Sequence, residues 1–186
     1  FVETGAELRA FDTRFGRVGM VICEEMWHSL PATILALGGA ELLVVVSASP
    51  ARDFTAGSGG YPANLERWEQ IAPGAAREHG VFVVVAQLVG SEGGKLFPGG
   101  SIACGPDGGV LARGPLLDEA ITIASLDASS IDRARVVSPL LSDLEQMLPH
   151  LQRSLDATRP GVMALDITDD SAAEGDPAQA ISALVG

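Results

Sequence analysis

Arg17-Val-Gly-Met-Val-Ile-Cys23-Glu-Glu-Met-Trp-His28 and, after a short gap, Glu41-Leu-Leu-Val-Val-Val-Ser-Ala-Ser49 set the architecture of this chain. The two apolar runs are each long enough for a strand that is buried on both faces. Between them, residues 31–38 predict a short helix that ends at a pair of glycines. A strand, a helix and a second strand in this order predict two parallel neighbours with a right-handed crossover.

Cys23 stands at the end of the first of these strands, where the apolar run stops at Glu24 and Glu25. A nucleophile is well served by this position, with a rigid strand behind it and an open crevice ahead of it. The alternative is that Cys23 is a small buried apolar residue, as most free cysteines are. Spacing alone leaves both interpretations open, because the reactivity of a thiol depends on its surroundings.

The same reasoning places further elements along the chain. Strands are expected at 7–13, 81–86, 101–104, 110–113 and 119–126, and helices at 64–79, 129–135 and 139–155. The glycine-rich segments 51–62 and 91–98 are expected to be loops, and Gly105-Pro-Asp-Gly-Gly109 predicts a hairpin turn. Periodicity stops near Ala157, which predicts a folded domain over 1–156 and an acidic, disordered tail over 157–186.

Composition narrows the classes of partner. The net charge of −12 argues against nucleic acid and against an anionic membrane surface. No stretch reaches the roughly 18 apolar residues of a membrane span. Two cysteines and three scattered histidines give no metal-ligand spacing, so we expect no metal and no cofactor. Cys104 is expected to be a core residue, and a reducing cytoplasm is the expected compartment.

Several blocks carry a resemblance to a known family. They are 15–28 around Cys23, 39–43, 47–52, 76–90, and 97–101 followed by 105–110. In this order and spacing they closely resemble the nitrilase superfamily, the carbon–nitrogen hydrolases, over about residues 5–153. The run from Cys23 to His28 is most similar to the amidase branches, which include the glutamine amidotransferase domain of NAD synthetases. Glu25 stands where those domains usually have Asp, and Gln87 where many relatives have Asn.

The resemblance implies an α/β fold, an αββα four-layer sandwich whose members dimerise through helices. It also implies a catalytic glutamate and a catalytic lysine upstream of the cysteine, and neither has a counterpart here. The chain begins at Phe1, so we expect it to be the C-terminal part of such a domain, with the N-terminal part missing. The implied reaction is hydrolysis of a non-peptide carbon–nitrogen bond, in an amide or a nitrile, through a thioester at Cys23.

Site roles follow from the same resemblance. Cys23 is the expected nucleophile, and the backbone N–H of Glu24 is expected to stabilise the oxyanion. Glu25, Trp27 and His28 are expected to bind substrate. For these three side chains the alternatives are solvent exposure, core packing and a structural role, respectively.

Activation of the thiol is the unsolved part, because a cysteine attacks as the thiolate and needs a nearby cation or base. Lys95 is the only lysine, and it follows the cysteine in a glycine-rich segment. Arg52 follows the second strand and could face the same crevice, but an arginine is a poor proton acceptor. Neither residue is a convincing substitute for the upstream groups.

Two hypotheses therefore stand. The first is an amidase-type enzyme, inactive as this fragment, that acts on a small amide or nitrile and forms a homodimer or higher homo-oligomer. The second is a non-catalytic remnant or scaffold that keeps the dimerisation surface.

Overall fold

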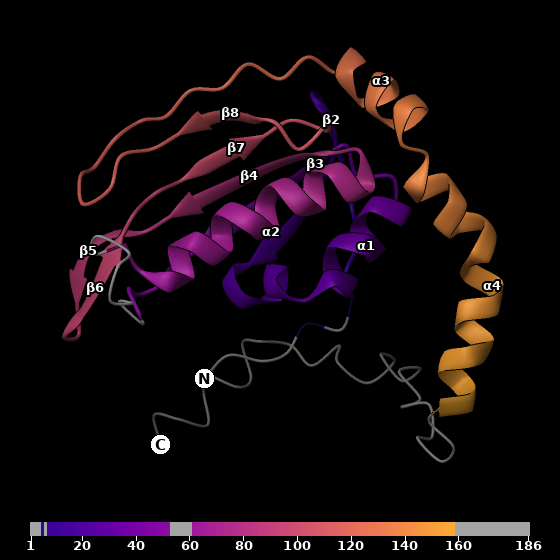
Figure 1. Ribbon diagram of the computed structural model, residues 1–186, viewed down its shortest axis with the longest axis horizontal. Helices are drawn as coiled ribbons and strands as arrows, with labels where there is room; N and C mark the ends of the chain where they lie inside the picture. The colour runs from indigo at the N-terminus through magenta and orange to yellow at the C-terminus, as the bar shows by residue number, and fades with distance from the viewer. Residues whose placement is uncertain (1–4, 6, 53–60, 159–186) are drawn as a thin grey trace, which may run out of the picture. The chain divides into compact units, whose positions relative to one another are not determined.

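The computed structural model describes residues 5, 7–52 and 61–158. Its elements, in chain order, are β1 (Phe11–Thr13), β2 (Gly16–Ile22), η1 (Cys23–Trp27), α1 (Ser29–Leu37), β3 (Leu42–Ser47), α2 (Ala63–His79), β4 (Phe82–Gln87), β5 (Val89–Glu92), β6 (Lys95–Pro98), β7 (Ile102–Cys104), β8 (Val110–Arg113), α3 (Ser129–Val137) and α4 (Leu140–Thr158). Six strands form one sheet in the order β1-β2-β3-β4-β7-β8 (Figure 1). Strands β5 and β6 form a separate two-stranded sheet. The chain divides into two compact units between Met147 and Leu148, and the first unit contains both sheets.

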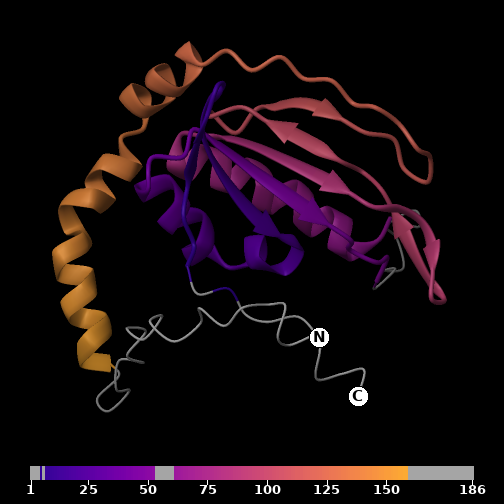
Figure 2. The same cartoon turned by 180° about the vertical axis from the view of Figure 1, so that it is seen from behind.

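The three central strands are parallel and follow from their sequences. β2, β3 and β4 are rich in valine, whose branched side chain favours extended backbone. Val21 pairs with Val45, and Val45 pairs with Val85. The crossover helices α1 and α2 lie on the same face of this sheet (Figures 1 and 2). The predicted strand–helix–strand unit is confirmed.

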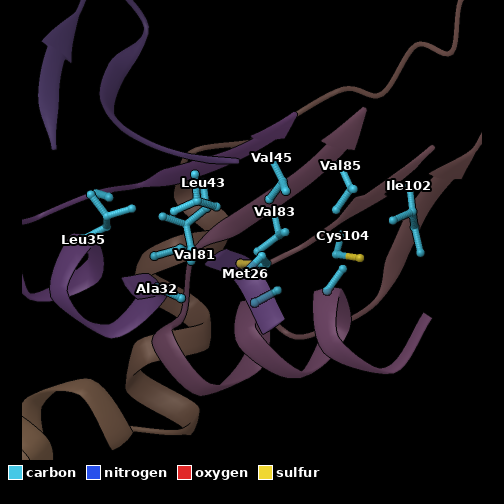
Figure 3. Close-up of a cluster of buried hydrophobic side chains, with 14 of the residues drawn as sticks. Met26, Ala32, Leu35, Leu43, Val45, Val81, Val83, Val85, Ile102 and Cys104 are labelled. Atoms are coloured by element: carbon cyan, nitrogen blue, oxygen red, sulfur yellow. The ribbon is translucent and has the colours of Figure 1, made fainter. Parts of the chain in front are cut away.

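The core lies between that face and the two helices. Leu43 and Val45 of β3 and Val83 and Val85 of β4 are completely buried and point toward the helices (Figure 3). Trp68 of α2 is equally buried within the same cluster. Side chains alternate along a strand, so every second residue of β2, β3 and β4 faces this core.

The opposite face of the sheet is apolar and partly exposed. Met20, Ile22 and Val46 are about half exposed on it. One helical layer and one sheet layer are thus present among the described residues, which corresponds to two layers of a four-layer sandwich. Apolar surface of this kind is normally buried against a second layer.

Two sequence-based predictions are wrong. Residues 91–98, predicted as a loop, contain most of the β5–β6 hairpin, in which Glu92 pairs with Lys95 across two glycines. Residues 119–126, predicted as a strand, form none, and Ile121 and Ile123 are 93% and 83% exposed. Alternating apolar residues make a strand only where a neighbouring strand accepts their hydrogen bonds.

The other elements agree with prediction apart from their ends. The first strand is shorter than expected and starts at Phe11. The hairpin turn at 105–109 joins β7 to β8 as predicted. Most of the tail predicted over 157–186, and residues 53–60 of the predicted 51–62 loop, lie outside the described residues. None of the described helices is long and apolar enough to cross a bilayer.

Candidate active site

Cys23 occupies a strained position at the junction of β2 and η1. It is the first residue of the short 3-10 helix, and its backbone φ is +48°. Residues with a Cβ seldom adopt this left-handed conformation, which is energetically costly and is found often at active sites. The turn leaves the Cys23 side chain partly accessible, whereas its neighbours on β2 that face the core are buried.

A row of three side chains crosses the carboxyl ends of the parallel strands. Cys23 follows the last residue of β2, and Ser47 and Gln87 are the paired last residues of β3 and β4. Each of the three lies two residues after a core-facing valine of its strand (Val21, Val45 and Val85) and so continues the alternation toward the helices. Ser47 is buried, and its Oγ donates a hydrogen bond to Sγ of Cys23 at 3.4 Å. The Nε2 atom of Gln87 is buried and has no hydrogen-bond partner among the described residues.

A small pocket of about 100 Å³ opens beside the thiol. Its lining comes from the β2–η1 junction, the segment that follows β3 and the first turn of α2: Cys23, Glu24, Trp27, Ser49, Pro50, Arg52 and Asn64. Arg52 supplies the only cation of this lining, among the residues that the structure describes. Binding at the carboxyl edge of a parallel sheet is the general arrangement of α/β proteins.

Asn64 holds one wall of this pocket in place, the Ser49–Arg52 wall, which follows β3 in the chain. Its Nδ2 donates to Oγ of Ser49 and to the carbonyl oxygen of Pro50, both at 2.8 Å. Its Oδ1 accepts a hydrogen bond from the backbone N–H of Arg52 at 3.1 Å. Asn64 is 7% exposed. A buried amide with its donors and its acceptor engaged is a strong local constraint, because breaking any of these bonds leaves a buried polar group unpaired.

Trp27 forms the aromatic part of the pocket lining. Its ring meets that of Trp68 edge to face, with centroids 5.8 Å apart and an interplanar angle of 71°. The guanidinium of Arg67 lies over the Trp27 ring at 4.3 Å. Trp68 is core, as the helical spacing predicts, and it braces Trp27 against the pocket.

The structure therefore brings together Cys23, Glu24 and Trp27 of the predicted site, and it places the other two elsewhere. Glu25 is exposed and turns back, so that its Oε2 accepts a hydrogen bond from the Ile22 N–H at 2.6 Å. His28 follows η1, is exposed and does not line the pocket. Their roles in substrate binding stay predictions.

Sequence reasoning did not assign roles to Ser47, Ser49 and Asn64. The two serines could have been found, because they continue the core-facing positions of a strand whose carboxyl end points at the site. Asn64 carries no such signal, since its partners lie 12 to 15 residues earlier in the chain. Lys95, weighed as a source of positive charge, is exposed on β6 and does not line the pocket.

The second cysteine differs sharply from the first. Cys104 of β7 is completely buried, as expected for a core residue. Burial raises the pKa of its thiol to about 11, because a low-dielectric environment disfavours the charged form. Within the described ranges, no group of three His, Cys, Asp or Glu side chains is arranged to hold a metal ion.

Comparison with known proteins identifies the family. Residues 1–136 match the family described as carbon-nitrogen hydrolase. The chain is 30% identical over 152 residues to a glutamine-dependent NAD(+) synthetase of Rhodobacter capsulatus, which covers 75% of this chain and 26% of that protein. It is 30% identical over 139 residues to a nitrilase of Pyrococcus abyssi, covering 73% of this chain and 47% of the nitrilase.

A solved structure agrees with this result. The carbon-nitrogen hydrolase of Helicobacter pylori G27 superposes with a TM-score of 0.70 at 28% identity, over 77% of this chain and 51% of the other. The chain thus spans about half the length of that structure, and a quarter to a half of the two relatives. The predicted α/β fold of the nitrilase type is confirmed. The chain belongs to the carbon–nitrogen hydrolase family, the nitrilase superfamily.

Proposed function

We propose that this chain carries the nucleophile of an enzyme that hydrolyses non-peptide carbon–nitrogen bonds, and that Cys23 is that nucleophile. The observation that carries the proposal is the position of Cys23. The residue is held at φ +48° at the carboxyl end of β2, beside a pocket. Its sulfur accepts a hydrogen bond from the buried hydroxyl of Ser47. Membership of the carbon–nitrogen hydrolase family supports the reaction class.

The reaction follows from the chemistry of a thiolate. The sulfur of Cys23 attacks the carbonyl carbon of a small amide, and the carbon–sulfur bond forms as the carbonyl oxygen becomes an oxyanion. The backbone N–H of Glu24, next in the chain, is the proposed donor to that oxyanion. The carbon–nitrogen bond then breaks, the amine leaves with a proton, and a thioester remains. Water hydrolyses the thioester to a carboxylic acid and restores the thiol.

The pocket side chains have proposed roles as well. Trp27, braced by Trp68 and Arg67, would form an apolar wall for the acyl group. Glu25 and His28 lie outside the pocket lining, so a role for either in substrate binding requires a substrate that extends beyond the pocket. A nitrile is the second substrate class that the family allows.

Turnover needs a general base and a cation as well as the thiol. The glutamate and lysine that the resemblance implies have no counterpart in this chain, and the only lysine, Lys95, is not part of the pocket. We therefore expect the 186-residue chain by itself to accept an acyl group at Cys23 from an activated substrate but not to turn over. A homodimer or higher homo-oligomer is the proposed assembly.

Alkylation with iodoacetamide tests the nucleophile separately from turnover. We expect one label per chain, located by peptide mapping on Cys23, because Cys23 is partly accessible and Cys104 is buried. The Cys23→Ala variant should not be labelled, and Cys104→Ser should be labelled like the parent chain. Labelling of Cys104 before Cys23 would instead favour the non-catalytic scaffold.

A further inference from the structure

We propose that Asn64 is a specificity-determining positioning residue, which sets the width of the Cys23 pocket by fixing its Ser49–Arg52 wall. The proposal rests on the assignment of Cys23 as nucleophile, but not on turnover. The hydrogen bonds of the Asn64 amide go to other residues than Cys23. Asn64 acts through three residues that line the same pocket or adjoin its lining.

The hydrogen-bond pattern distinguishes Asn64 from an ordinary residue of a helix start. It lies in the first turn of α2, after Pro62, where a polar side chain commonly bonds the backbone of its own helix. The three bonds of the Asn64 amide run instead to Ser49, Pro50 and Arg52. The buried Asn64 side chain of α2 thus holds the Ser49–Arg52 segment, which follows β3 and is not part of a strand.

Two backbone hydrogen bonds also hold this wall among the described residues. The Ala51 N–H donates to the carbonyl oxygen of Leu96 at 2.8 Å, and the Ala63 N–H donates to that of Arg52 at 3.2 Å. These bonds tie the segment to β6 and to the start of α2, but neither involves Ser49 or Pro50. Within the described ranges, Ser49 and Pro50 are thus held by the Asn64 amide.

Asn64→Asp is the sharpest perturbation. It keeps the size of the side chain and the acceptor for the Arg52 N–H, but it replaces both donors by an oxygen. That oxygen would face the Pro50 carbonyl oxygen across the present 2.8 Å, and two acceptors at that distance repel. Gln70→Glu makes the same amide-to-acid change at an exposed position of α2 and is the matched control.

The readout is the ratio of two alkylation rates at Cys23, one with bulky N-ethylmaleimide and one with small iodoacetamide. A general change in thiol reactivity moves both rates together, whereas a wider pocket favours the bulky reagent. We expect the ratio to rise about fivefold or more in Asn64→Asp and Asn64→Ala, the factor expected when the wall loses about one net hydrogen bond. In Gln70→Glu the ratio should stay within about twofold of the parent chain.

The melting temperature of each variant is measured alongside the rates. An unchanged ratio in Asn64→Asp would overturn the proposal, and with a lowered melting temperature it would leave Asn64 a merely structural residue. An equal rise in Gln70→Glu would overturn it as well. If Asn64→Ala does not fold, Asn64→Asp alone decides. Labelling of Cys104 before Cys23 in the parent chain would count against the proposed function, but the ratio of rates at Cys23 could still be measured.

Discussion

Replacing Ser47 by alanine is expected to slow the reaction of Cys23 with iodoacetamide about five- to tenfold. The reason is the hydrogen bond from the buried Ser47 hydroxyl to Sγ of Cys23, which is 3.4 Å long. A sulfur hydrogen bond of this length is at the weak end for a charged acceptor, so we take its net worth as about 1 to 1.4 kcal/mol. Since about 1.4 kcal/mol is a factor of ten in rate, the loss corresponds to the stated range.

The assay is pseudo-first-order alkylation at one fixed pH, followed by peptide mapping of the label on Cys23. Ser91→Ala is the control, because it removes the same kind of hydroxyl from an exposed position of β5 that does not line the Cys23 pocket. We expect the control to change the iodoacetamide rate by less than about twofold. Equal rates in Ser47→Ala and the parent chain would refute the view that this hydroxyl supports the reacting sulfur.

Four further predictions concern stability and the second thiol. Burial lowers the pKa of His79 from its ordinary value of 6.5, so below about pH 6.5 the unfolded chain binds the extra proton. The free energy of unfolding should therefore fall by up to about 1.4 kcal/mol per pH unit as the pH drops, until the folded-state pKa is passed. Urea titrations should show a flatter pH dependence in His79→Gln, but not in the exposed His28→Gln. Cys104, buried and with its pKa raised to about 11, should be alkylated at least about a hundredfold more slowly in the native than in the unfolded chain, and comparable rates would contradict its place in the core. Gly19→Ala should destabilise the fold by about 1 to 3 kcal/mol, because the new Cβ would lie 2.9 Å from two buried leucine side chains. Gly74→Ala, in open space within α2, should stabilise it by about 0.5 to 1 kcal/mol, and a loss of stability there would contradict the position of Gly74 on an open face of the helix.

The central part of the fold could be predicted because its signals are local. The valine-rich runs of β3 and β4 admit few alternatives, and the turn at 105–109 contains the glycines that a hairpin needs. The errors at 91–98 and 119–126 share one cause. Whether an extended segment becomes a strand depends on a hydrogen-bonded neighbour, and a neighbour is not visible in the segment itself.

In the candidate site too, local features could be predicted from the sequence, and contacts between distant segments could not. The location of Cys23 was predictable because it directly follows a buried strand, which is a local feature, whereas its role as the nucleophile stays a proposal. The contact between Cys23 and Ser47 depends on the register of two strands, with Ile22 opposite Val46. A register shift of one residue would point Ser47 away from the thiol. The bonds of Asn64 depend on where α2 starts relative to the end of β3, and no periodicity encodes that.

The most direct test of Cys23 as the nucleophile is the mass of the intact chain after rapid mixing with a small activated amide or ester and an acid quench. We expect that the mass rises by one acyl group, that the group maps to the peptide containing Cys23, and that hydroxylamine removes it as it removes a thioester. The Cys23→Ala variant should gain no mass. An acyl group on any other residue, or equal acylation of the Cys23→Ala variant, would contradict the assignment of Cys23 as the nucleophile.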